Sequence, residues 1–270
     1  MLVCALGDVL LDVIVRLERP LERGDDVRAA SIAAPGGQAA NVAAWAVALG
    51  GDARCVARCG DDAAGAWVAA ELIGRDVELV GPADGRTGVV VSIVSPEGER
   101  TMASDRGTAT LLAPDDLDPA WLACDCLHIS GYALLASPID AAAVRAAELA
   151  RTAGAQVSVD LSAWTRIRAH GPSRFGEQLD VLAPDVAFGT EREWEELGPV
   201  GAAIRVIKRG AAGFDVVREG EPPLRCQARD VAVVDTTGAG DALAAGFLVG
   251  GPELALDAAA RCVARVGAMP

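Results

Sequence analysis

Short apolar runs alternate along the chain with longer segments in which apolar residues recur at helical spacing. The short runs, each of strand length, lie at residues 2–7, 54–57, 126–129, 156–160, 185–188 and 204–208. The segments of helical length lie at 38–49, 62–74, 138–153 and 190–197, with a last pair at 240–250 and 253–266. This alternation predicts an α/β fold with a mainly parallel sheet and helices on both of its faces.

Two segments, 12–34 and 86–106, depart from this alternation because they are extended, half-polar and interrupted by turn residues. A strand–turn–strand structure is predicted for each, with Pro-Glu-Gly-Glu at 96–99 as one turn. We therefore expect a small β-sheet beside the main one. The sequence shows no internal repeat or obvious linker, which predicts a single domain over 1–270.

Composition and charge restrict the classes of partner. Hydrophobic residues make up 51% of the 270 residues, as in a globular protein, and the net charge is −14 with no basic run. A surface of this sign repels nucleic acid and anionic membranes, so neither is expected as a partner.

The cysteines and the N-terminus predict a cytoplasmic protein. The seven cysteines form no C-x-x-C pair and the chain has two histidines, so reduced thiols are favoured over a zinc site. The apolar N-terminus lacks a basic region and carries Asp8 and Asp12, which favours a buried strand over a signal peptide. The sequence contains no uninterrupted apolar stretch of about 20 residues, so no membrane span is predicted.

The stretch DTTGAGDALAAGF at 235–247 is the first candidate for chemistry. Gly238, Ala239 and Gly240 precede a predicted helix, whose free N–H groups and dipole attract phosphate oxygens. Asp241 would then lie close enough to a phosphoryl group to take a proton from an attacking hydroxyl. A glycine turn with an aspartate cap is the structural alternative. Leu243 excludes a dinucleotide fingerprint, and the absence of a nearby lysine excludes a Walker loop.

Three further features lie at predicted element ends. Pro35-Gly36-Gly37 leads into a helix that carries Asn41, and Asp8 and Asp12 follow the first strand, where parallel sheets bind ligands. Each of these side chains could bind a sugar hydroxyl or serve only as a turn or strand end. Thr190 and Glu193 have the spacing of a capping box. Lys208, Gly210 and Gly213 form a glycine turn suited to a nucleotide or to a hairpin.

Together these motifs resemble the ribokinase-like, or PfkB, family of carbohydrate kinases. DTTGAGDALAAGF is similar to the C-terminal signature of that family, and GGQAANVAAWAVALGG at 36–51 is similar to its N-terminal signature. The order and spacing match from GDVLLD at 7–12 to the final helices. The resemblance implies a ribokinase-like three-layer α/β sandwich with a small β-sheet lid.

The resemblance also implies a role for each matching residue. Asp241 becomes the catalytic base, and the anion hole is formed by Gly238, Ala239 and Gly240. The predicted substrate-binding residues are Asp12, Gly36, Gly37, Asn41 and Arg106, with Gly36-Gly37 as the hinge of the lid. The predicted nucleotide-binding residues are Lys208, Gly210, Gly213 and Thr236. Glu193 is expected to order Mg²⁺ through water, so ATP and Mg²⁺ are the expected cosubstrate and cofactor.

Several positions depart from the family pattern. Thr190 stands where the family has asparagine, and Ser162 and Trp164 replace its asparagine and basic residue near the nucleotide phosphates. The chain ends soon after Cys262, which leaves a monovalent cation at Asp235 undecided. Gln38 replaces a lysine of many ribokinases, so ribose is not assumed as the substrate.

The predicted function is an ATP-dependent sugar kinase that phosphorylates a primary hydroxyl. A nucleoside kinase is the first alternative, although the lid segments contain no aromatic residue to stack on a base. A sugar-binding protein that has lost turnover is the second alternative. The lid segments carry apolar residues such as Val13, Val15, Val89, Val91 and Ile93, which should alternate between the two faces of the small sheet. One face would cover the sugar and the other would be left apolar, so we expect a homodimer built through the lids.

Overall fold

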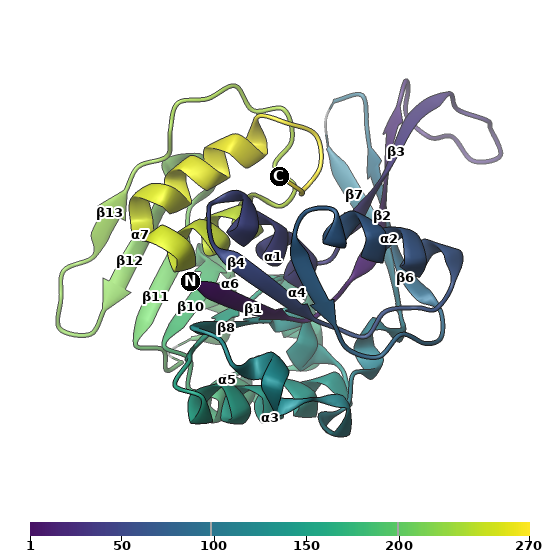
Figure 1. The fold of residues 1–270 in the computed structure, drawn as a ribbon. Helices are drawn as coiled ribbons and strands as arrows, with labels where there is room; N and C mark the ends of the chain where they lie inside the picture. The colour runs from purple at the N-terminus through teal and green to yellow at the C-terminus, as the bar shows by residue number, and fades with distance from the viewer. Residues whose placement is uncertain (98, 199) are drawn as a thin grey trace.

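The computed structural model describes residues 1–97, 99–198 and 200–270. A nine-stranded sheet runs through its centre in the order β13-β12-β11-β10-β9-β8-β1-β4-β5 (Figure 1). The strands are β1 (Leu2–Leu6), β4 (Asp52–Val56), β5 (Val77–Val80), β8 (Cys126–Ser130), β9 (Gln156–Asp160), β10 (Val186–Thr190), β11 (Ile204–Lys208), β12 (Phe214–Arg218) and β13 (Leu224–Cys226). The strands from β11 to β5 pair in parallel, and β12 and β13 add an antiparallel edge.

Helices cover both faces of this sheet. Val3 and Ala5 of β1 pack in a core with α1 (Gln38–Ala48), α2 (Ala63–Ile73) and α7 (Ala239–Val263). Cys4 and Leu6 of the same strand pack in a second core with α3 (Ile139–Thr152) and α5 (Pro172–Leu182). The remaining helices are α4 (Trp164–His170), α6 (Glu191–Leu197) and the short 3₁₀ segments η1 (Thr108–Leu111), η2 (Pro114–Asp116), η3 (Pro119–Leu122), η4 (Gly131–Leu135) and η5 (Gly210–Ala212). Successive residues of a strand face opposite sides of the sheet, so β1 is covered by helices on both faces. This arrangement confirms the predicted three-layer α/β fold.

The last helix is long because two helices follow each other directly. Gly250 and Gly251 have non-helical backbone angles and precede Pro252, which agrees with the predicted pair at 240–250 and 253–266. By length and composition alone, the 25 residues of α7 could cross a membrane. However, Ala242, Ala245 and other residues of α7 are buried in the core with α1, which accounts for its apolar character.

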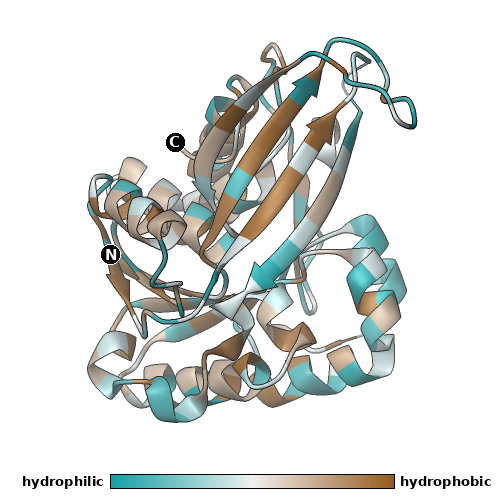
Figure 2. Ribbon diagram, turned by 90° about the vertical axis from the view of Figure 1, so that its right-hand side faces the viewer, coloured by the Kyte–Doolittle hydropathy of each residue, from teal (hydrophilic) through white to brown (hydrophobic). Residues whose placement is uncertain are grey.

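The two extended segments form a second, four-stranded sheet, called here the lid. Its strands are β2 (Leu10–Leu17), β3 (Ala29–Gly36), β6 (Thr87–Val94) and β7 (Arg100–Gly107), in the order β3-β2-β6-β7. The central pair is parallel and the outer pairs are antiparallel. Ser95 N donates to Glu99 O at 2.9 Å across the predicted 96–99 turn, of which Gly98 lies outside the described residues. Figure 2 shows apolar residues along the two central strands of the lid.

Some elements were absent from the pattern-based prediction. Strand β5 has only four residues, and β12 carries a buried Asp215, so neither gives a clear strand pattern. Helices α4 and α5 are separated only by Gly171, and α4 exposes most of its residues. The turn after Lys208 is a hairpin between β11 and β12, one of the two structures that the sequence allowed.

Candidate active site

The start of α7 has the geometry that an anion site requires. Gly238 has φ +76° and forms the N-cap, and a Cβ there would lie 2.5 Å from Ala268 Cβ. Only glycine therefore fits this position. Ala242 N donates to Gly238 O at 2.9 Å, so the preceding N–H groups lie in the first turn, where a helix provides no carbonyl partners. These N–H groups and the helix dipole can stabilise a negatively charged oxygen.

Asp241 lies in this first turn, and its side chain is half-buried. Asn41 Nδ2 of α1 donates to Asp241 Oδ2 at 2.7 Å, across 200 residues of sequence. Burial raises the pKa of Asp241 to about 7, since the hydrogen bond from Asn41 and the charge of Lys208 offset only part of that cost and nearby Asp160 adds to it. A carboxylate with such a pKa can accept a proton efficiently near neutral pH.

The lid brings Asp12 to the start of α1. A Cβ on Gly36 would lie 2.1 Å from Asp12 Cγ, and a Cβ on Gly37, which has φ +96°, would lie 2.3 Å from Asp8 O. Both glycines are therefore required by close packing against this pair of aspartates. Burial raises the pKa of Asp12 to about 6, and Arg100 of β7 partly offsets it.

Arg106 lies at the end of β7 and is paired inside the protein. It forms an ion pair with Asp8, which is 2% exposed, and its guanidinium lies 3.9 Å from the ring centre of Tyr132. Burial lowers the pKa of Arg106, with Tyr132 opposing this change. The sequence predicted Arg106 as a substrate contact but gave no sign of its contacts with Asp8 and Tyr132.

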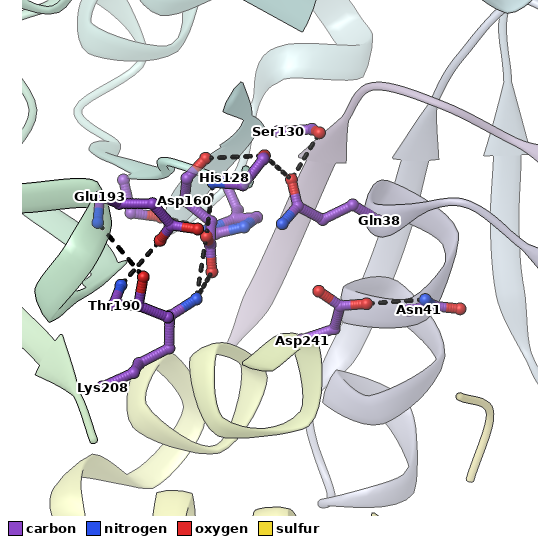
Figure 3. A network of polar contacts seen from close by, with 11 residues as sticks. Gln38, Asn41, His128, Ser130, Asp160, Thr190, Glu193, Lys208 and Asp241 are labelled. Atoms are coloured by element: carbon purple, nitrogen blue, oxygen red, sulfur yellow. Dashed lines mark hydrogen bonds and ion pairs between the residues drawn. The ribbon is translucent and has the colours of Figure 1, made fainter. Parts of the chain in front are cut away.

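The ends of the parallel strands carry a polar network that Figure 3 shows from close by. Lys208 Nζ donates to both oxygens of Asp160, at 2.7 and 3.0 Å. Burial lowers the pKa of Lys208, but Asp160 and Glu193 outweigh it and hold this pKa above its usual value. A Cβ on Gly240 would lie 3.2 Å from Lys208 Nζ, so this ammonium group borders the candidate anion hole.

Glu193 of α6 is held by a capping box. Thr190 N donates to Glu193 Oε2 at 2.7 Å, and Glu193 N donates to Thr190 Oγ1 at 3.3 Å. Burial raises the pKa of Glu193, with Asp160 adding to the effect and Lys208 opposing it. Thr190 thus orients the predicted Mg²⁺-ordering carboxylate through its backbone N–H, while its hydroxyl, which stands in place of the family's amide, caps the first turn of α6.

Ser162 and Trp164, which differ from the family pattern, both make side-chain contacts in the site region. Ser162 Oγ donates to Gln38 Oε1 at 2.8 Å, and Ser130 Oγ donates to the same oxygen at 2.5 Å. Trp164 begins α4. The guanidinium carbon of Arg192 lies over the Trp164 ring, 3.5 Å from the ring centre. Gln38 and the two serines are polar residues of the site that the sequence analysis did not group together.

The predicted nucleotide residues are divided between two loops. Gly210 and Gly213 lie in the β11–β12 turn with φ +57° and +89°. Gly210 is exposed, whereas Gly213 is buried, and a Cβ on Gly213 would lie 2.0 Å from Cys226 O. Thr236 lies in the segment before α7, where its carbonyl accepts from Ala239 N at 3.3 Å. In the same segment Asp235 accepts from Thr237 N, Thr237 Oγ1 and Gly267 N.

The metal donors of the site are few. Within 1–97, 99–198 and 200–270, no group of three or more His, Cys, Asp or Glu side chains is arranged to hold a metal ion. Glu193 and Asp160 are the carboxylates beside Lys208. This donor set fits Mg²⁺ bound largely by phosphate and water oxygens, as is common for this ion with nucleotides.

Comparisons with known proteins show which sequences this chain resembles. An ATP-dependent ribose-1-phosphate kinase from Halopiger xanaduensis is 32% identical over 282 residues, which cover 96% of this chain and 90% of that protein. A fructokinase from Klebsiella pneumoniae is also 32% identical, covering 91% of this chain and 82% of the relative.

Solved structures share the fold over nearly the whole chain. The adenosine kinase from Sinorhizobium meliloti superposes with a TM-score of 0.89 at 25% identity, over 99% of this chain and 95% of that one. The ribokinase from Arabidopsis thaliana, complexed with ribose and ATP, gives a TM-score of 0.77 at 25% identity, over 100% and 95%. The model of the pfkB family carbohydrate kinases matches residues 1–269. The chain therefore belongs to the PfkB family of carbohydrate kinases and is an ATP-dependent phosphotransferase.

Proposed function

We propose that this kinase transfers the γ-phosphate of ATP to a primary hydroxyl of a small sugar or sugar derivative, with Asp241 as the general base. The observation that supports this role is the carboxylate of Asp241, with a pKa raised to about 7, in the first turn of α7. A proton acceptor and an anion site then lie within one helical turn.

In the proposed reaction, the substrate hydroxyl approaches Asp241, which accepts its proton as the new O–P bond forms and the bond to ADP breaks. The N–H groups of Gly238, Ala239 and Gly240 stabilise the oxygens of the transferred group, and Lys208 contributes a positive charge beside Gly240. Mg²⁺, whose use follows from the family, supplies charge neutralisation on the phosphates, and Glu193 orders its water ligands. The lid excludes water, which would otherwise accept the phosphoryl group.

The substrate-binding role is assigned to residues at the junction of the lid and α1. Asp12 and Asn41 present a carboxylate and an amide to sugar hydroxyls, and Gly36 and Gly37 allow the backbone to approach closely. Arg106 lies beside them, anchored by its ion pair inside the protein. Motion of the lid would pivot at Gly36-Gly37.

The nucleotide is assigned to the β11–β12 turn and the segment before α7. Gly210 and Gly213 would border the nucleoside, with Lys208 and Thr236 nearer the phosphates. Asp235 accepts three hydrogen bonds, which leaves one free acceptor position on its carboxylate for a monovalent cation.

A nucleoside kinase is the second candidate because of one aromatic residue. The lid segments themselves contain no Phe, Tyr or Trp, but Tyr132 of η4 lies against Arg106 of the lid. A nucleobase could stack on this ring, and the adenosine kinase from Sinorhizobium meliloti shares the fold. The third candidate is a sugar-binding protein without turnover; the intact Asp241 and the capped Glu193 favour an active enzyme.

The experiment is an ADP-release screen with Mg²⁺ and sugars, sugar acids, sugar phosphates and nucleosides, with Asp241→Asn as the control. We expect turnover of a sugar or sugar derivative that the control variant lacks. Turnover of nucleosides alone would replace the proposal with the second candidate. Sugar binding by calorimetry without ADP release from any compound would favour the third.

We also propose that the enzyme acts in the cytoplasm as a homodimer joined through the lids. Val13 and Val91 are neighbours on the lid face opposite Asp12, and both are half-exposed. A partner lid would bury this apolar face and leave the two active sites equivalent. The cytoplasmic location rests on the sequence, in which seven scattered cysteines favour reduced thiols.

Light scattering tests the dimer. The wild type should give about twice the 27.6 kDa of one chain, and Val91→Glu should give a monomer. A fully active wild type of 27.6 kDa would refute the dimer and leave the kinase assignment intact.

A further inference from the structure

Three residues form a row across the lid on the face that carries Asp12. Arg16 of β2 pairs in register with Val94 of β6, which pairs with Arg100 of β7. Arg16 is four residues after Asp12 on the same strand, and side chains alternate between faces. Two guanidinium groups therefore lie on the face of the lid that carries the proposed sugar ligand.

This row and the segment before α7 enclose a cleft of about 350 Å³, lined by Arg16, Val94, Arg100, Val233, Val234, Asp235 and Thr236. The cleft lies close to the proposed chemistry, because the segment continues through Thr237 to Gly238. The hydroxyl of Thr237 is in contact with the guanidinium of Arg100. Burial raises the pKa of Asp12, and the charge of Arg100 offsets part of this rise, so Arg100 acts on the candidate sugar site.

The cleft is lined by two positively charged side chains and one negatively charged side chain. In the part of the chain that the structure describes, neither Arg16 nor Arg100 forms an ion pair, and the buried Nε of Arg16 has no hydrogen-bond partner. The negative side chain is Asp235, which accepts hydrogen bonds from Thr237 and Gly267 and interacts with the charge of Arg100, so one of the two positive charges has no counterpart in the cleft lining. Two guanidinium groups that line one cleft, in a chain of net charge −14, provide a local site for an anion.

The geometry of a guanidinium group selects the ligand. Arginine binds phosphate and carboxylate oxygens in pairs, with two parallel N–H···O bonds. The Cα atoms of Asp12 and Arg16 are about 13 Å apart along β2, a distance that a sugar with an added anionic group and an arginine side chain together span. The valines of the cleft contribute no polar partner for an uncharged hydroxyl group.

We propose that the substrate is a sugar that already carries a phosphate or carboxylate group, and that Arg16 and Arg100 bind this group. The proposal rests on the proposed function, since it places the reactive hydroxyl at Asp241. It goes further by naming the substrate class and the residues that select it.

The test compares neutral and anionic sugars that share a free primary hydroxyl: ribose with ribose 1-phosphate, fructose with fructose 1-phosphate, and glucose with gluconate. We expect kcat/KM for one anionic compound to exceed that of its neutral partner by about 10–100-fold, the contribution of charge-assisted hydrogen bonds. The double variant Arg16→Gln/Arg100→Gln should lose this advantage, because its KM should rise much more for the anionic sugar than for the neutral partner. Arg28→Gln, an exposed lid arginine outside the cleft, is the control and should retain the advantage.

The outcomes separate this inference from the proposed function. A preference for a sugar 1-phosphate assigns the cleft to phosphate, and a preference for gluconate assigns it to carboxylate. Equal use of neutral and anionic sugars, or equal losses for both in the double variant, refutes the inference and leaves the sugar kinase in place. Calorimetry of ribose 1-phosphate, fructose 1-phosphate and gluconate without ATP gives a readout independent of turnover. Binding of one compound that the double variant loses supports the anion site, and absence of binding by all three refutes it.

Discussion

Replacement of Asp241 by asparagine would remove the proposed base and keep nearly the same shape. The amide can still contact Asn41, so we expect an intact fold and intact sugar binding. It cannot accept the proton of the substrate hydroxyl, and kcat should fall by about 10²–10⁴-fold.

The same substitution should stabilise the protein at alkaline pH. Burial raises the pKa of Asp241 from its ordinary 3.8 to about 7, a difference of about 3 pH units that corresponds to at most about 4 kcal/mol. Between these two pKa values the folded state holds a proton that the unfolded state has released, so wild-type stability decreases as the pH rises through this interval. Because the side chain is only half-buried, we expect about 2 kcal/mol, or about 4–8 °C in Tm.

Thermal unfolding without ligands at pH 5 and pH 8, together with steady-state kinetics, measures both effects. The variant should have the higher Tm, with a difference that is larger at pH 8 than at pH 5. Asp115→Asn, at an exposed position of η2, is the control and should change neither kcat nor Tm appreciably. A kcat above about one tenth of the wild type would exclude Asp241 as the base. A Tm difference independent of pH would show that burial does not raise its pKa.

Three other substitutions test the surroundings of this carboxylate. Asn41→Ala removes the 2.7 Å hydrogen bond to ionised Asp241, so the acidic limb of the kcat/KM profile should move to higher pH by about 1–2 units. Gly36→Ala would place a Cβ 2.1 Å from Asp12 Cγ and should raise the sugar KM at least about tenfold, while calorimetry shows unchanged ADP binding. Lys208→Met leaves a buried carboxylate without its partner and should destabilise the fold by about 3–5 kcal/mol in denaturant unfolding; an unchanged free energy of unfolding would contradict the ion pair.

The sequence predicted those parts of the fold in which local pattern and tertiary burial agree. Strands such as β1 and β8 are buried on both faces and appear as short continuous apolar runs. The half-exposed strands of the lid were distinguishable because their turns interrupt them. The edge strands β12 and β13 and the polar helix α4 were not predicted, since tertiary contacts determine their conformation more than their own pattern does.

The candidate site was predictable in its residues but not in their pairing. The glycine positions at the starts of α1 and α7 are local properties, because their backbone angles exclude other residues. The bonds of Lys208 to Asp160 and of Ser162 to Gln38 join residues 48 and 124 positions apart. They depend on the order of the strands in the sheet, which a single sequence does not specify.

The charges of the site explain why it can accept ATP in a chain of net charge −14. Asp8 and Asp160 are buried, and each is neutralised by a basic side chain of the protein. Asp12 and Asp241 lack such a partner at close range, and burial instead raises their pKa values to about 6 and about 7, so Asp12 stays mostly ionised near neutral pH and Asp241 is only partly ionised. The partial protonation of Asp241 reduces its repulsion of the incoming phosphates, and Lys208 adds a positive charge beside Gly240. Asp241 can then take up the proton of the hydroxyl at the step where negative charge is moving to the phosphoryl group.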